Sequence, residues 1–215
     1  MSTPTSLYLD FQIDDASAAR AKSVLAVAIE AAPIASVLLR HGQGAKIAAE
    51  TARPLIALAQ AQGIAVLIAS DTGETDMLGA DGVHLLWSSN IIRSFKTARQ
   101  SAPVAIVGAD AGRSRHDAME LGENGADYVA FGIPPHVEDR EKAAERQRDL
   151  ISWWSELFEV PCVAFDVPDS EAAHALAASG ADFVSVSVTS TDTEQDAADR
   201  VRAYSAALRI PETAS

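Results

Sequence analysis

The sequence has 215 residues, of which 48% are hydrophobic, and it carries a formal net charge of −13 at pH 7. A chain of this length and apolar content can bury a sizeable core, and no linker-like tract divides it, so we expect one domain over 1–215 with a core at about 6–210. The acidic balance argues against nucleic acid and anionic membranes as partners, because both surfaces require clustered Lys and Arg.

The chain contains one cysteine, Cys162, which excludes an intramolecular disulfide. The polar opening MSTPTS has no basic segment leading into an apolar one. No stretch approaches the roughly 18 uninterrupted apolar residues of a membrane-spanning helix. We therefore expect a cytoplasmic protein without a membrane span.

Short runs rich in β-branched and aromatic residues alternate with Ala-rich helical patterns, which is typical of repeated βα units on a parallel sheet. Strands are expected at 6–12, 34–41, 65–71, 82–87, 103–110, 128–132, 161–166 and 183–189. Helical patterns lie at 15–32, 44–63, 90–102, 114–125, 141–159, 169–180 and 192–210. This order predicts a (β/α)₈ TIM barrel. The alternative, a doubly wound open sheet, would show a glycine-rich phosphate turn after the first strand, and DFQIDDAS is not one.

One phrase occurs three times, as GADGVHL (79–85), GADYVAF (125–131) and GADFVSV (180–186). Its Gly permits a left-handed turn after a helical stretch, its Ala permits a tight turn into a strand, and its Asp comes where the strand begins. These positions lie on the N-terminal face of a barrel, where special residues serve stability. We therefore predict a structural role for the phrase and chemistry at the opposite strand ends.

Strand alternation predicts which side chains point into the barrel. If the valines of FVSVSVT (183–189) face the helices, Ser185 and Ser187 point inward. Aligning the three phrases places His84 level with Ser185 and Gly132 level with Ser187. A lumen histidine has two interpretations, a ligand-binding group or a core residue satisfied by a neighbouring hydroxyl or carboxylate.

The same alternation places Leu38 and Arg40 inward on the second strand, and Ala164 and Asp166 inward on the seventh. The predicted upper rim holds Asp10, Arg40, His41, Asp71, Asp110 and Asp166, with Trp87, Arg113 and His136 in the following loops. Four carboxylates at one rim would raise one another's pKa values or recruit a metal. Alternatively, several of these Asp side chains are loop or helix caps.

With VLLRHG (37–42), VLIASD (66–71) and IVGAD (106–110), the three phrases resemble the thiamine phosphate synthases and the related thiazole tautomerases. The resemblance covers nearly the whole chain in element order. It implies a (β/α)₈ barrel that joins an aminopyrimidine diphosphate to a thiazole phosphate, with Mg²⁺ holding the diphosphate. It also implies a small-molecule ligand, either a heterocycle or a phosphorylated metabolite, and a homo-oligomer such as a dimer.

The resemblance assigns site residues only where the family's pattern is kept. Of the strand-two pattern Gln-x-Arg-x-Lys, Arg40 survives, and of the strand-three Asn-Asp, Asp71 survives as the expected metal ligand. Gly132 survives from a Gly-Pro element, and Arg140 keeps the charge of a lysine. Mg²⁺ is thus implied only through the family, because Ser89 replaces its second carboxylate.

Two further departures put acids where the family binds phosphate: Asp110 replaces a serine, and Asp166 replaces the first residue of a Gly-Gly pair. A carboxylate repels phosphate, and a Cβ blocks its close approach. We therefore expect synthase activity to be absent or very weak, in a divergent barrel that is non-catalytic or has altered specificity. Two alternatives remain: an active thiamine phosphate synthase or thiazole tautomerase, and a different enzyme that uses the rim carboxylates.

The predicted site has three classes of residue. The candidate catalytic residues are Arg40, Asp110 and Asp166, the candidate metal ligand is Asp71, and the candidate substrate-binding residues are His41, His84, Trp87, Gly132, Arg140, Ser185 and Ser187.

Overall fold

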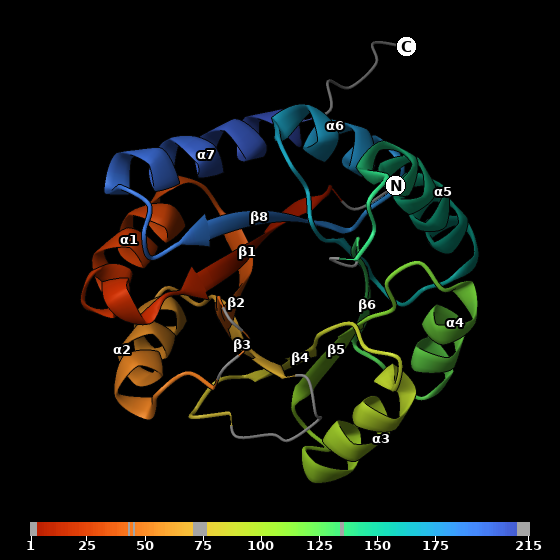
Figure 1. Ribbon diagram of the computed structural model, residues 1–215, viewed down its shortest axis with the longest axis horizontal. Helices are drawn as coiled ribbons and strands as arrows, with labels where there is room; N and C mark the ends of the chain where they lie inside the picture. Colours follow the sequence, from red (N-terminus) through yellow and green to blue (C-terminus); the bar gives the residue numbers. More distant parts are fainter. Residues whose placement is uncertain (1–3, 43, 45, 71–76, 134–135, 210–215) are drawn as a thin grey trace.

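The computed structural model describes residues 4–42, 44, 46–70, 77–133 and 136–209. Eight parallel strands close into a barrel in sequence order, and a ring of helices surrounds them (Figure 1). The strands are β1 (Ser6–Ile13), β2 (Ile34–His41), β3 (Ala65–Ser70), β4 (Gly82–Leu85), β5 (Ile106–Asp110), β6 (Tyr128–Phe131), β7 (Cys162–Ala164) and β8 (Phe183–Thr189). The predicted TIM barrel is confirmed, and the open doubly wound sheet is excluded.

The helices follow the predicted order. They are α1 (Ala18–Ala31), α2 (Ala49–Gln60), α3 (Ile91–Ser101), α4 (Arg115–Glu123), α5 (Arg140–Leu157), α6 (Ser170–Ala178) and α7 (Glu194–Ala207), with a short 3₁₀ helix η1 (Asp15–Ser17) before α1. Between β3 and β4 the described residues 77–81 form a turn and no helix. None of the helices in the described ranges is both long and apolar enough to cross a membrane.

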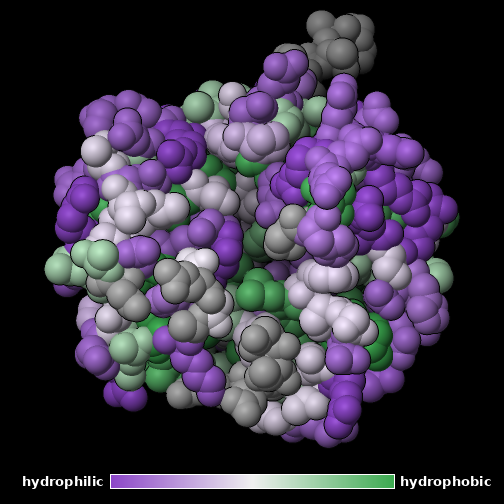
Figure 2. All heavy atoms as spheres, viewed as in Figure 1, coloured by the Kyte–Doolittle hydropathy of each residue, from purple (hydrophilic) through white to green (hydrophobic). Residues whose placement is uncertain are grey.

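The side chains form two apolar clusters, one between strands and helices and one inside the barrel. The inner cluster consists of Tyr8, Leu38, Leu67, Tyr128, Ala130, Val163 and Phe165. The valines of β8 belong to the outer cluster, so Ser185 and Ser187 point inward as predicted. Hydrophilic residues cover most of the outer ring in Figure 2, whereas hydrophobic surface is visible in the hollow at the barrel axis.

The prediction that Ala164 points inward is wrong. Ala164 packs in the outer cluster, and its neighbours Val163 and Phe165 point into the lumen. Asp166 nevertheless reaches the rim, because its backbone has a φ of +57° and turns the chain sharply after the strand. The location predicted for Asp166 was therefore right, while the strand register that predicted it was not.

The Asp side chain of each Gly-Ala-Asp repeat links neighbouring strands by a hydrogen bond at the N-terminal face of the barrel. In each copy the Asp carboxylate accepts a 2.8 Å hydrogen bond from a backbone N–H at the start of the preceding strand, in the pairs Asp81–Val66, Asp127–Val107 and Asp182–Cys162. Gly125 and Gly180 follow α4 and α6 with φ of +84° and +98°. Gly79 also has a positive φ but follows a turn, which corrects the expectation of a helix before each copy.

Candidate active site

A cavity of about 250 Å³ opens at the C-terminal ends of the strands, where the active sites of TIM-barrel enzymes lie. Its lining consists of Leu38, Arg40, His84, Leu86, Trp87, Asp110, Ile133, Phe165 and Asp166. The structure therefore brings together the three candidate catalytic residues and two of the candidate substrate-binding residues. They come from β2, β4 and β5 and from the segments after β4 and β7.

Arg40 is held by a two-pronged ion pair with Asp10. Its Nε lies 2.6 Å from Asp10 Oδ1 and its Nη2 lies 2.8 Å from Oδ2. Ser187 also donates a 3.0 Å hydrogen bond to Asp10, so Ser187 supports the ion pair and does not line the cavity. Burial by itself would lower the pKa of Arg40, but the hydrogen bonds and charge of Asp10 outweigh it and raise the pKa. Arg40 therefore remains a cation at the cavity wall.

Asp110 and Asp166 converge above Gly132. Oδ1 of Asp110 accepts hydrogen bonds from the N–H groups of Gly112, at 2.7 Å, and Gly132, at 3.0 Å, while Asp166 Oδ2 accepts one from Ile133 at 2.7 Å. A Cβ atom on Gly132 would lie 2.6 Å from Asp110 Oδ2 and 2.9 Å from Asp166 Oδ2. Only glycine leaves room for both carboxylates, which explains why this position lacks a side chain.

Both carboxyls hold protons more tightly than an exposed aspartate does. Burial raises the pKa of Asp110 to about 7, against the opposing effect of its two backbone N–H partners and with a further contribution from the charge of Asp166. Burial likewise raises the pKa of Asp166, although the Ile133 N–H and the positive charge of Arg140 oppose the rise. Both side chains bond loop backbone, as the capping interpretation predicted, and burial contributes more to their raised pKa values than their mutual charge does.

The raised pKa of Asp110 predicts a pH dependence of stability. The pKa of Asp110 is 3.8 in the unfolded chain and about 7 in the folded protein. Between these two pH values the folded state binds a proton that the unfolded state has lost, so the free energy of unfolding decreases as pH rises. The full shift corresponds to roughly 4 kcal/mol at most. The Asp110→Asn variant cannot titrate here. In urea unfolding with EDTA present, its free energy of unfolding relative to wild type should increase from about pH 4 to about pH 8. Parallel pH profiles would contradict the assignment.

His84 is buried at the cavity floor and is neutral. Burial, together with a smaller effect of the nearby charge of Arg40, lowers the pKa of His84 to about 3. Its Nδ1 lies 2.8 Å from the hydroxyl of Tyr128, which in turn lies 2.8 Å from the hydroxyl of Tyr8. Neither tyrosine was predicted as a site residue, although both occupy inward positions of their strands and alternation could have found them.

The remaining predicted residues lie around the cavity. Trp87 covers Gly112, and its ring centroid lies 5.1 Å from that of His136. Arg140 lines a neighbouring cavity of about 120 Å³ and donates a 3.3 Å hydrogen bond to the carbonyl of Ile133. The structure does not place His41, which ends β2, or the buried Ser185 in the lining of the main cavity. Asp71 lies outside the described residues.

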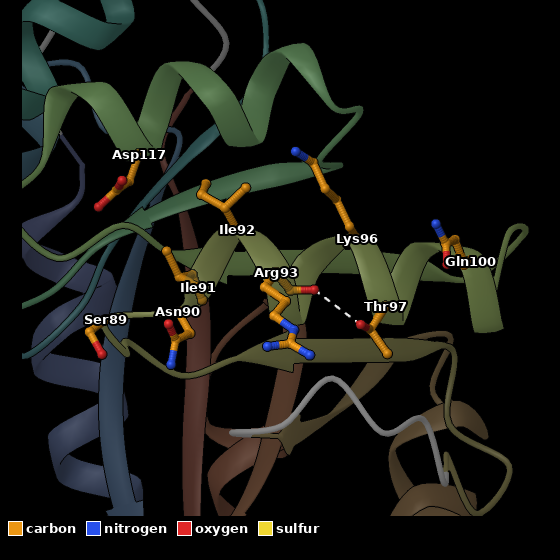
Figure 3. A pocket seen from close by; sticks show the side chains of 9 residues that line it. All are labelled: Ser89, Asn90, Ile91, Ile92, Arg93, Lys96, Thr97, Gln100 and Asp117. Carbon is orange, nitrogen blue, oxygen red and sulfur yellow. Dashed lines mark hydrogen bonds between the residues drawn. The ribbon is translucent and has the colours of Figure 1, made fainter.

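Two other cavities lie away from the predicted site. One of about 450 Å³ follows α3 and the start of α4 (Figure 3), where the hydrogen bond drawn joins Thr97 to the carbonyl of Arg93 within one helix. The other, of about 750 Å³, lies at the N-terminal ends of β1 and β2, which is the stability face of such barrels. No residue of the predicted site lines either of them.

Comparison with known proteins identifies relatives of the whole barrel. The family described as thiamine monophosphate synthase matches residues 10–190. A thiamine-phosphate synthase of Hyphomonas neptunium is 40% identical over 201 residues, which cover 91% of this chain and 89% of the relative. One of Rhodospirillum centenum is 36% identical over 166 residues, covering 75% of this chain and 78% of the relative.

Solved structures agree on the fold. A thiamine phosphate pyrophosphorylase of Pyrococcus furiosus has a TM-score of 0.70 and 21% identity, covering 94% of this chain and 95% of its own. A 3-hexulose-6-phosphate synthase of Salmonella typhimurium has a TM-score of 0.66 and 18% identity, covering 93% of this chain and 97% of its own. At these identities the likeness shows the barrel and nothing finer.

The hypothesis of a divergent, non-catalytic barrel is wrong. Relatives up to 40% identical over most of the chain are thiamine-phosphate synthases by name, which favours the alternative of an active synthase. Arg40 and His84 line one cavity with Asp110 and Asp166, so the replaced residues belong to an assembled site at the barrel mouth. The chain belongs to the thiamine monophosphate synthase family.

Proposed function

We propose that this protein is a thiamine-phosphate synthase, which joins an aminopyrimidine diphosphate to a thiazole phosphate and releases pyrophosphate. The observation that carries the proposal is the family match at residues 10–190, which spans every residue lining the cavity at the barrel mouth. That cavity has the position expected for chemistry in this fold and holds a permanent cation, Arg40, beside a neutral histidine.

In the proposed reaction a bond forms between the thiazole nitrogen and the methylene carbon of the pyrimidine, while the bond from that carbon to the diphosphate oxygen breaks. Negative charge leaves with the diphosphate. Nη1 of Arg40 is not engaged by Asp10 and supplies donors to this group, and a charged donor in a buried site stabilises developing charge strongly. The ion pair with Asp10 fixes where Arg40 points, so little reorganisation accompanies the reaction.

The described residues can be tested for their fit to Mg²⁺, which the family implies. No group of three His, Cys, Asp or Glu side chains suited to a metal occurs in the described ranges. Mg²⁺ is commonly bound by one or two carboxylates together with substrate phosphates, so the carboxylates of Asp110 and Asp166 fit this chemistry, and Asp71 remains a further proposed ligand. When bound, the ion would neutralise charge on the diphosphate.

Removal of divalent metal is therefore expected to stop the reaction. Treatment with EDTA should reduce the rate of pyrophosphate release by at least about 100-fold. Without the metal, the uncompensated charge on the leaving group raises the activation free energy of the reaction by several kcal/mol. Excess Mg²⁺ should restore the rate, whereas the same ionic strength of Na⁺ should not. Full activity in EDTA would contradict the metal requirement.

Complementation tests the proposed function in a cell. A bacterial strain that lacks its thiamine-phosphate synthase should grow without thiamine when it expresses this protein. The Arg202→Ala variant, altered at an exposed ion pair of α7, is the matched control and should also support growth. Absence of growth with soluble wild-type protein, confirmed by immunoblot, would count against the proposal.

The setting of the reaction is also a proposal. We infer a single barrel domain that works in the cytoplasm as a homo-oligomer such as a dimer, with small-molecule ligands and with neither nucleic acid nor a membrane as partner. The net charge of −13 supports the exclusion of anionic surfaces. Size-exclusion chromatography with light scattering tests the oligomer, since a monomer at enzyme-assay concentration would contradict it.

A further inference from the structure

A chain of hydrogen bonds crosses the lumen beneath the cavity. Tyr8 on β1, Tyr128 on β6 and His84 on β4 are 2%, 7% and 1% exposed, and successive polar atoms along the chain lie 2.8 Å apart. It ends at Nδ1 of His84, whose ring lines the cavity. Nε2 on the other side of that ring has no hydrogen-bond partner among the described residues.

The aromatic packing around this chain holds the imidazole in one orientation. The ring of His84 is nearly parallel to that of Tyr128, with centroids 5.8 Å apart and planes 10° apart, and it also stacks on Phe165 at 4.9 Å. Tyr128 in turn lies against the backbone of Gly108, where a Cβ atom would be 2.0 Å from Cζ of the ring. The stacking fixes the plane of the imidazole, and the hydrogen bond to Tyr128 fixes which edge of the ring holds Nδ1.

The positions of the protons follow from counting donors and acceptors. Burial raises the pKa values of Tyr8 and Tyr128, so each phenol keeps its one proton. The hydroxyl of Tyr8 has no partner other than Tyr128 in the described part of the chain. If Tyr128 donated to Tyr8, the Tyr8 proton would be buried without an acceptor, at a cost of about 1–3 kcal/mol. Tyr8 therefore donates to Tyr128, and Tyr128 donates to His84.

We propose that Tyr128, itself oriented by Tyr8, is a positioning residue that fixes His84 as the neutral tautomer with its proton on Nε2. Nδ1 must accept the Tyr128 proton, so the single proton of the neutral ring belongs to Nε2. Nε2 then offers an uncharged hydrogen-bond donor to an acceptor atom of the substrate, either a ring nitrogen or a phosphate oxygen. Only the identity of this acceptor rests on the proposed function.

Nitrogen-15 NMR of the histidine side chains tests the proposal without substrate. The His84 signals, assigned by their absence in His84→Gln, should show the Nε2–H tautomer and stay unchanged between about pH 5 and about pH 8. In Tyr128→Phe, Nδ1 loses its donor, so the His84 signals should move to a mixture of tautomers.

Two other tyrosines supply matched controls. Tyr8→Phe should cause a smaller shift than Tyr128→Phe, and Tyr204→Phe, which removes a buried hydroxyl bonded to the carbonyl of Val167, should leave the His84 signals unchanged. An Nδ1–H tautomer in wild type, or the wild-type tautomer retained in a folded Tyr128→Phe variant, would overturn the proposal. Because no substrate is present, neither result depends on whether the protein is a synthase.

Discussion

Replacing Arg40 with alanine is expected to lower kcat/KM for thiamine phosphate formation by roughly 100-fold or more, which is the usual effect of removing one buried donor to developing charge. Arg40 is the cation that lines the cavity, and its guanidinium is already oriented by two hydrogen bonds to Asp10. Steady-state kinetics, with one substrate varied while the other is saturating, would measure the decrease in kcat/KM. Arg202→Ala, at an exposed pair with Asp199, should stay within about twofold of wild type.

The same substitution also affects folding, because it leaves Asp10 buried at 2% exposure without its counter-ion. Breaking a buried pair in this way costs about 3–5 kcal/mol. The double variant Asp10→Asn with Arg40→Ala removes the uncompensated charge, so it should regain stability in urea unfolding but no activity. Wild-type kcat/KM in either variant would show that Arg40 does not act on the substrate.

Replacing Trp154 with alanine is expected to lower the free energy of unfolding by about 3–5 kcal/mol. Trp154 on α5 is fully buried, its ring stacks on Phe158 with centroids 4.0 Å apart, and its indole N–H donates a 2.6 Å hydrogen bond to the carbonyl of Val160. It also meets Phe131 of β6 edge to face, so it joins the helix to the barrel wall. Truncation would leave a cavity and an unsatisfied carbonyl.

Leu157 on the same helix is the matched control, since 66% of it is exposed. Leu157→Ala removes apolar atoms without opening a cavity, so it should change stability by less than about 0.5 kcal/mol. Urea denaturation followed by circular dichroism would compare the two variants. Equal losses would mean that the packing of Trp154 contributes no more than a surface side chain.

The barrel and most of its inward residues could be predicted because parallel strands follow a strict two-residue alternation. That rule placed Arg40, His84 and Ser187 correctly from sequence alone. It failed at β7, which has only three residues, because such a short strand shows no alternation and Asp166 is placed by a left-handed backbone. No local pattern encodes that backbone conformation at a non-glycine residue.

Pairings across the lumen were also beyond a local pattern. The ion pair between Asp10 and Arg40 depends on the register that sets Asp10 beside Leu38, one inward position below Arg40. The bond between Tyr8 and Tyr128 joins β1 and β6, which are not neighbours in the barrel, and sequence spacing does not relate them. Single motif residues also predict activity poorly, because the identity to the relatives extends over 91% of the chain and is not confined to the motifs.

The synthase assignment is tested most directly by an assay of the purified protein with the aminopyrimidine diphosphate, the thiazole phosphate and Mg²⁺. Thiamine phosphate, identified by mass spectrometry, should form with one equivalent of pyrophosphate, and its formation should fall by about 100-fold or more in Arg40→Ala. Failure of the folded wild-type protein to form thiamine phosphate under these conditions would contradict the assignment of a synthase site at the mouth of the barrel.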